Sequence, residues 1–159
     1  KSIYVVFGGS STVLDWLFDF DVQLIPYGGC TGCKVHQGYY FDQKITFPIV
    51  LPAVKMLQLW YPRYKVVVTG HSKGAAQATL TALDLIAARV RDVTLINFGS
   101  PRVGNQAFAE YASSKLGTHY RVTHHMDTIP NVPARKQGYM HITGRRWATV
   151  GVIICVLCR

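Results

Sequence analysis

The chain has 159 residues, of which 49% are hydrophobic and 16% are charged, and its net charge is +9. This composition excludes a disordered chain, and the length predicts a single domain with a sizeable core. The basic residues are scattered and no nucleic-acid-binding motif accompanies them, so we expect no nucleic-acid partner. A membrane-spanning helix needs about 20 apolar residues, and the longest apolar run, Trp147 to Leu157, is shorter than that. We therefore expect no transmembrane segment.

Short β-branched runs alternate with longer helical patterns along the chain. In chain order we predict a strand at 3–7, a helix at 12–22, a helix at 52–61, a strand at 65–69, a helix at 73–90, a strand at 93–98, a helix at 105–116 and a strand at 119–124. Pro52 suits the first turn of its helix, and Pro62 ends that helix. Buried strands that alternate with helices predict an α/β fold, with a mainly parallel sheet and helices on both faces. Functional residues of such sheets lie at the carboxyl ends of the strands.

Four cysteines form two Cys-x-x-Cys pairs, Cys30/Cys33 and Cys155/Cys158. Such pairs are typical of redox motifs, of half zinc sites or of local disulfides. The two pairs lie much further apart than the roughly 15–20 residues usual between the halves of a zinc site, and Cys30 follows a turn-rich loop instead of opening a helix. We therefore expect no metal site and favour a structural disulfide between Cys30 and Cys33, which indicates an oxidising compartment. The pairing of Cys155 with Cys158 stays open.

The segment Gly70-His71-Ser72-Lys73-Gly74 fits the Gly-x-Ser-x-Gly pattern between a predicted strand and a predicted helix. In a nucleophile elbow the serine sits on a strained turn above the sheet, and the glycines let the strand and the helix pass close together. The helix N-terminus directs free N–H groups and a positive dipole end at the serine, which favours the oxyanion formed in acyl transfer. Ser72 is the predicted nucleophile; the alternative is a glycine-rich turn with an incidental serine.

A serine nucleophile needs a base, and the base needs a carboxylate that orients it. In this fold the three follow in the order Ser, Asp or Glu, His. Asp127 directly follows the strand at 119–124, at the sheet edge where Ser72 emerges, and it is the predicted acid. The other acidic residues after Ser72 lie inside predicted helices or in a turn before a strand: Asp84, Asp92 and Glu110.

His141 is the one histidine downstream of Asp127, and it is the predicted base by elimination. His124 and His125 precede the acid on or just after its own strand, an awkward place from which to reach both partners. His36 lies upstream, and His71 is expected to point away from the nucleophile because of its place in the turn. The alternative role for His141 is that of a loop histidine bonded to backbone.

Several segments of the chain resemble the class 3, or fungal-type, triacylglycerol lipases of the α/β-hydrolase fold. The likeness covers residues 3–141 and is carried by "VVFGGSSTVLDW", "GCTGCKVHQGYY", "VVVTGHSKGAA", "NFGSPRVGNQAFAEY" and "YRVTHHMDTIPNVP". The resemblance implies a secreted or luminal serine carboxylester hydrolase without a cofactor. Its substrates would be acylglycerol-type esters at an oil–water or membrane interface. The acyl preference and the oligomeric state are not set by these motifs.

Matched residue by residue, the family's roles fall on Ser72 (nucleophile), Asp127 (acid), Ser10 and the N–H of Lys73 (oxyanion hole), Trp16 (lid) and Cys30/Cys33 (disulfide). The segment 12–22 carries more apolar side chains than one buried helix face requires. That excess is typical of a lid that opens on lipid, and the alternative is an ordinary packed surface helix.

The chain departs from the family pattern at several points. Lys73 stands where the family usually has an apolar residue, and Ala75 replaces a frequent glycine. The family's triad histidine lies tens of residues beyond the segment matched by "GYMH", so His141 falls on a different family histidine, and residues 142–159 match nothing in the pattern. No signal peptide precedes the strand at 3–7, so the chain looks truncated at one or both ends. The rival hypothesis is a catalytically impaired, lipase-like protein that binds lipid or a partner.

Overall fold

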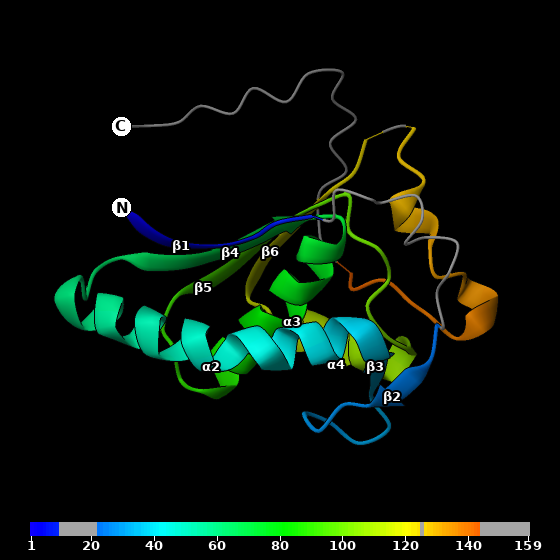
Figure 1. The fold of residues 1–159 in the computed structure, drawn as a ribbon, viewed down its shortest axis with the longest axis horizontal. Coiled ribbons are helices and arrows are strands. Elements are labelled where there is room, and N and C mark those ends of the chain that lie inside the picture. The colour runs from blue at the N-terminus through cyan, green and yellow to red at the C-terminus, as the bar shows by residue number, and fades with distance from the viewer. Residues whose placement is uncertain (10–21, 125, 144–159) are drawn as a thin grey trace.

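The computed structural model describes residues 1–9, 22–124 and 126–143, and Figure 1 shows a sheet with helices packed beneath it. The sheet has four parallel strands in the order β1 (Ser2–Phe7), β4 (Lys65–His71), β5 (Val93–Phe98) and β6 (Thr118–Val122). A separate antiparallel pair consists of β2 (Leu24–Pro26) and β3 (Lys34–His36). All four predicted strands are therefore confirmed, and β6 ends earlier than the sequence predicted. The predicted mainly parallel sheet is confirmed as well.

The helices of the described residues are α2 (Gln37–Trp60), α3 (Lys73–Ala87) and α4 (Gln106–Lys115), with short 3₁₀ turns at Ile129–Asn131 and Arg135–Gln137. The predictions of α3 and α4 are confirmed, although α3 ends before Val90. None of these described helices is long and apolar enough to cross a membrane. Residues 12–21 of the helix predicted at 12–22, together with Ser10, Trp16, Cys155 and Cys158, lie outside the described residues.

The prediction that a helix starts at Pro52 is wrong, because α2 already begins at Gln37. The His36 side chain caps this helix by accepting a hydrogen bond from the Gly38 N–H at 3.1 Å. Pro48 and Pro52 both lie inside α2, and both are exposed. A proline removes one N–H donor from the helix, but on the solvent side water can satisfy the carbonyl that loses its partner. The prolines are therefore tolerated within the helix and do not mark its start.

All three described helices lie on the same face of the sheet (Figure 1). The chain crosses from β1 to β4, β5 and β6 in one direction, and each crossover contains one of the described helices. Parallel crossovers are almost always right-handed, so successive steps in one direction place their helices on the same side. Helices on both faces require a reversal of strand order, and the described strands contain none. On the other face of β1, Tyr4 and Val6 are 66% and 69% exposed.

The core lies between the sheet and α3, whose buried residues include Ala75, Ala76 and Ala78. These small side chains let α3 approach β4 and β5 closely, which fixes the start of α3 above the sheet edge. Cys30 and Cys33 form a disulfide in the loop between β2 and β3, as predicted. The Tyr27 N–H donates to the Cys33 carbonyl at 2.9 Å across the same loop.

Candidate active site

Ser72 occupies a strained turn between β4 and α3. Its backbone angles are φ 55° and ψ −126°, in a region that L-residues rarely adopt. The turn is held on both sides, because the Ser72 N–H donates to the Phe98 carbonyl and the Ser72 carbonyl accepts from the Ala75 N–H, each at 3.0 Å. Ser72 therefore stands at the carboxyl end of β4, next to the end of β5, as the elbow pattern predicts.

The two glycines of the elbow have a steric cause. A Cβ at Gly70 would overlap the carbonyl group of Gly74. A Cβ at Gly74 would lie 2.5 Å from the Phe7 carbonyl oxygen, closer than any side chain tolerates. The elbow thus packs against both its own strand and the end of β1, and only glycine fits at these two positions.

Ser72 is 1% exposed, and its buried hydroxyl has no hydrogen-bond partner among the described residues. Buried hydroxyls are normally paired, so an unpaired one beside a strained backbone suggests a functional group. The neighbouring N–H of Lys73 opens α3, and the Lys73 ammonium forms an ion pair with Asp42 of α2 at 2.5 Å. The charge that Lys73 introduces is therefore neutralised against α2.

The end of β1 leads past the elbow toward the second predicted oxyanion donor. A Cβ at Gly9 would lie 3.2 Å from the His71 carbonyl oxygen and 3.8 Å from the Ser72 Cβ. Gly9 thus borders the nucleophile directly. Ser10, the next residue, is outside the described residues, so its predicted role in the oxyanion hole stays a prediction.

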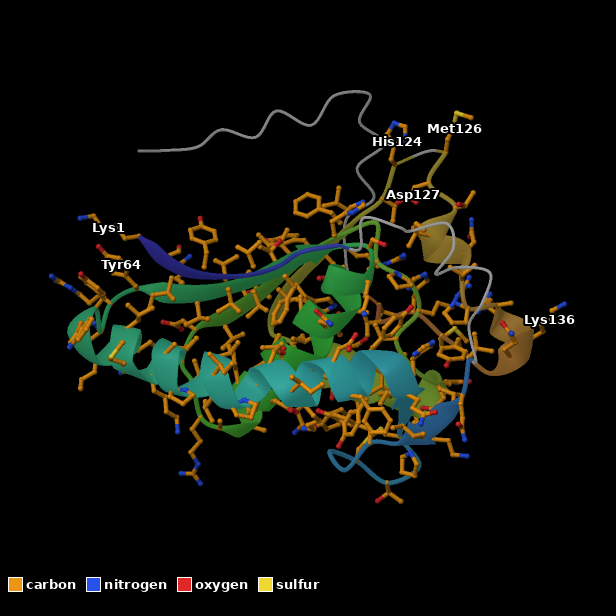
Figure 2. The ribbon with its side chains drawn as sticks, in the orientation of Figure 1. Lys1, Tyr64, His124, Met126, Asp127 and Lys136 are labelled. Carbon is orange, nitrogen blue, oxygen red and sulfur yellow. A yellow bond between two sulfur atoms is a disulfide. The ribbon has the colours of Figure 1, made fainter. Side chains whose placement is uncertain are left out.

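Asp127 follows β6 at the same sheet edge, and Figure 2 shows it in the loop that leaves that strand. Its Oδ1 accepts from the Ile129 N–H at 3.0 Å. Its Oδ2 lies over Gly99, where a Cβ would approach it to 2.5 Å. Gly99 directly follows β5 with φ 53°, and β5 is the neighbour of the elbow strand. The predicted nucleophile and acid therefore stand at the ends of β4 and β6, on either side of the end of β5.

His71 lies closer to this site than the sequence analysis expected. A Cβ at Gly99 would meet His71 Nε2 at 3.3 Å, and a Cβ at Gly9 would meet His71 Nδ1 at 3.4 Å. The imidazole therefore lies between the ends of β1 and β5, and it approaches the same point as Asp127 Oδ2. The signal that would have found it is the register, because His71 pairs with Phe98, the last residue of β5 before Gly99.

His141 is bonded to backbone in this structure. Its Nε2 lies 2.7 Å from the Pro130 carbonyl oxygen, and because a carbonyl only accepts, Nε2 carries the proton. Burial and the nearby charge of Arg121 lower the pKa of His141 to about 4, so the ring is neutral at pH 7. Within the described chain its hydrogen bond goes to Pro130, and none joins it to Ser72 or Asp127.

Comparisons with known proteins identify the family of this chain. The model of the family "Lipase (class 3)" matches residues 4–137. The chain belongs to the class 3 lipase family. The secreted mono- and diacylglycerol lipase A of Penicillium cyclopium is 34% identical over 94% of this chain, and the match covers 48% of that relative. The chain thus spans about half the length of this class 3 lipase.

Solved structures give the same result. Lipase II from Rhizopus niveus matches with a TM-score of 0.88 and 34% identity, over 94% of this chain and 58% of that one. A second lipase matches with a TM-score of 0.84 and 36% identity, over 88% of this chain and 54% of that one. That structure is described as a triacylglycerol lipase whose catalytic centre is formed by a serine protease triad. The relatives are named lipases, and none of these names supports a non-catalytic role.

Proposed function

We propose that this protein is a serine carboxylester hydrolase that acts on acylglycerol-type esters through an acyl-enzyme at Ser72. The observation that carries the proposal is the Ser72 hydroxyl, which is buried, unpaired within the described chain and held on a strained turn. We further propose that residues 1–159 form one lipase-like domain. No step of the chemistry below calls for a cofactor.

In the proposed reaction Ser72 Oγ attacks the ester carbonyl carbon, and a base takes its proton. The carbonyl oxygen becomes an oxyanion, which the N–H of Lys73 and the N–H and hydroxyl of Ser10 stabilise. Collapse of this intermediate breaks the ester bond and leaves the acyl group on Ser72, while the base returns the proton to the leaving alcohol. Water then attacks the acyl-enzyme by the same route and releases the fatty acid.

We propose His141 as the base, oriented by Asp127, because it follows the acid in the chain order of this fold. To act as the base, the His141 ring has to exchange its hydrogen bond with the Pro130 carbonyl for one with the Asp127 carboxylate. A carboxylate partner would raise the pKa of His141 from about 4 toward the range that a general base needs.

Ester hydrolysis by matched variants tests the proposal. We expect the folded wild type to hydrolyse a monomeric short-chain ester and Ser72→Ala to lose on the order of 10⁶ in kcat. His141→Asn should lose nearly as much, whereas His71→Asn, which alters the imidazole beside Gly99 and Asp127 Oδ2, should retain most of the activity. Full activity in Ser72→Ala would refute the proposed reaction. Full activity in His141→Asn, with loss in His71→Asn, would transfer the role of base to His71.

We also propose that residues 12–22, with Trp16, act as a lid and that the enzyme works on lipid aggregates. The rate per enzyme should then rise when an ester passes from monomeric to emulsified form. Equal rates on both forms would contradict the lid. The Cys30–Cys33 disulfide and the named secretion of the Penicillium relative support a secreted or luminal location.

A further inference from the structure

Helix α2 exposes a continuous line of large apolar side chains along its outer side. Six of them, at helical spacing, are between 47% and 79% exposed: Phe41, Ile45, Ile49, Met56, Leu59 and Trp60. We call these six residues the α2 stripe. The opposite side of the helix buries Tyr39, Gln43 and Val54. A surface helix normally carries polar residues on its outer side, so an apolar stripe of this length indicates a binding surface.

A basic hollow adjoins the C-terminal end of the stripe. It has a volume of about 270 Å³, and its cationic side chains are Lys55, Arg89 and Arg91. Leu59 belongs both to the stripe and to the lining of the hollow, so the two features form one surface. The side chain of Gln58 donates to the Arg91 carbonyl at 2.9 Å and ties α2 to the far wall of the hollow.

Arg89 stands where a glycine would suit the backbone better. It directly follows the last turn of α3, with φ 62°, and its N–H donates to the Ile86 carbonyl at 2.9 Å. The Val90 N–H donates to the Leu85 carbonyl, which completes the usual glycine-type helix end. A side chain in this left-handed conformation is strained. The chain nevertheless places a guanidinium here, at the wall of the hollow.

Charge around this surface is mostly positive. The one acidic residue of α2 is Asp42, which pairs with Lys73, and Asp84 of α3 pairs with Lys44. Asp92 follows Arg91 but does not line the hollow. Figure 2 shows Lys1 at the end of the molecule where α2 ends, and the exposed Arg63 and Lys65 follow that helix in the chain. Together with the net charge of +9, this favours an anionic partner.

We propose that the α2 stripe and the basic hollow dock the protein on an anionic lipid surface. The helix would lie in the plane of the interface with the stripe, up to Leu59, among the acyl chains, as amphipathic interfacial helices do. Trp60 and Tyr61 would sit at head-group depth, where aromatic residues with a polar atom are favoured. The hollow would receive phosphate-bearing head groups, through Lys55, Arg89 and Arg91.

This docking surface is separate from the ester site. Only the biological role of this surface, which is to hold the enzyme at a lipid surface, rests on the proposed function. The stripe begins near the elbow, since Asp42 pairs with Lys73, and α2 then runs toward the opposite end of the sheet (Figure 1). When α2 contacts the lipid, the helix therefore does not cover the strand ends that carry Ser72 and Asp127. These strand ends then lie beside the lipid surface.

Binding to vesicles tests the proposal without any hydrolysis. The Ser72→Ala protein is mixed with vesicles of phosphatidylcholine, alone or with phosphatidylglycerol, and the bound fraction is measured by co-sedimentation. The stripe variant is Ile45→Ser/Ile49→Ser. The hollow variant is Lys55→Ala/Arg89→Gly/Arg91→Ala, in which glycine relieves the strained position. The control, Lys34→Ala/Lys115→Ala/Lys136→Ala, removes the same charge at lysines that belong neither to the stripe nor to the lining of the hollow, and Figure 2 shows Lys136 at the other end of the molecule.

We expect preferential binding to the anionic vesicles, weakened by added salt. The hollow variant should bind them roughly 100-fold more weakly, and the stripe variant should lose a similar factor. The control should change less than about threefold. Melting temperatures close to that of the Ser72→Ala protein establish that the variants are folded.

Three results would overturn the proposal: unchanged binding by the stripe variant, equal losses in the hollow variant and the control, or a dimer that the stripe variant dissociates. The last result would assign the stripe to a second copy of the chain. The stripe and hollow substitutions, made in the protein that keeps Ser72, should leave hydrolysis of a monomeric ester unchanged. An inactive protein that still binds vesicles would remove the proposed function and leave the docking surface intact.

Discussion

The elbow after β4 and the loop after β6 meet at one edge of the sheet but are built in different ways. The elbow is defined by backbone contacts, because Gly70 and Gly74 have no room for a Cβ and Ser72 is bonded through both its N–H and its carbonyl. The loop after β6 is held by side chains, with Asp127 bonded to the Ile129 N–H and His141 to the Pro130 carbonyl. A site can thus join a rigid nucleophile to partners whose positions depend on exchangeable bonds.

The largest effect should come from adding a side chain at one of the two glycines of the elbow. Gly74→Ala would drive a Cβ to 2.5 Å from the Phe7 carbonyl oxygen. We expect it to lower the free energy of unfolding by about 3 kcal/mol or more, measured by urea denaturation. Gly117→Ala is the matched control, since a Cβ there meets no atom within 4 Å. Equal stability of the two variants would show that the backbone of the elbow shifts to accommodate a Cβ. The elbow would then be no more rigid than the loop after β6.

The stability of the loop after β6 should depend on pH through His141. The folded pKa of His141 is lowered from 6.5 to about 4, so between these values the unfolded chain binds a proton that the folded chain excludes. The free energy of unfolding should therefore fall as the pH falls through this window, by up to about 3 kcal/mol. His141→Gln should remove this part of the slope in urea denaturation at pH 7 and pH 4.5. A variant with the wild-type slope would show that the half-buried His141 does not exclude a proton in the folded state.

A smaller effect is expected from Arg102, which supports the same loop. Its guanidinium donates to the carbonyls of Asn131 and Pro133. Arg102→Met keeps much of the apolar stem and removes both bonds, and we expect it to lower the free energy of unfolding by about 2 kcal/mol. Arg63→Met, at an exposed site, serves as the reference. Equal stability of the two variants would mean that this hydrogen bonding does not hold the loop.

The smallest effect should come from the ion pair that ties the elbow to α2. The side chains of Lys73 and Asp42 are 25% and 34% exposed, so their pairing contributes about 0.5–1 kcal/mol at most. Asp42→Asn should therefore change stability by less than that and leave kcat within about threefold. A large loss of kcat with unchanged stability would show that the pair positions the oxyanion donor, and that the elbow depends on side chains after all.

The parts of the molecule that local rules govern could be predicted from the sequence. β5 was predicted with its exact bounds, and Ser72 and Asp127 were placed at one sheet edge because parallel strands end together. The C-terminal part of helix α2 is predicted, but its start is misplaced because Pro52 resembles the first turn of a helix, and because the His36 cap is visible only in three dimensions. The position of His71 was missed for a similar reason, since it depends on the register between β4 and β5. Placing all described helices on one face required the strand order, which no local pattern contains.

The most direct test of the account is labelling by a fluorophosphonate probe, with the modified residue located by peptide mass mapping. Such a probe reacts with a serine only when a base and an oxyanion hole activate it. We predict rapid labelling of the folded wild type at Ser72, and labelling slower by on the order of 10⁴ in Asp127→Asn. A folded protein that takes no label, that is labelled elsewhere, or that is labelled equally fast without the Asp127 carboxylate would contradict a Ser72 nucleophile activated at this edge of the sheet.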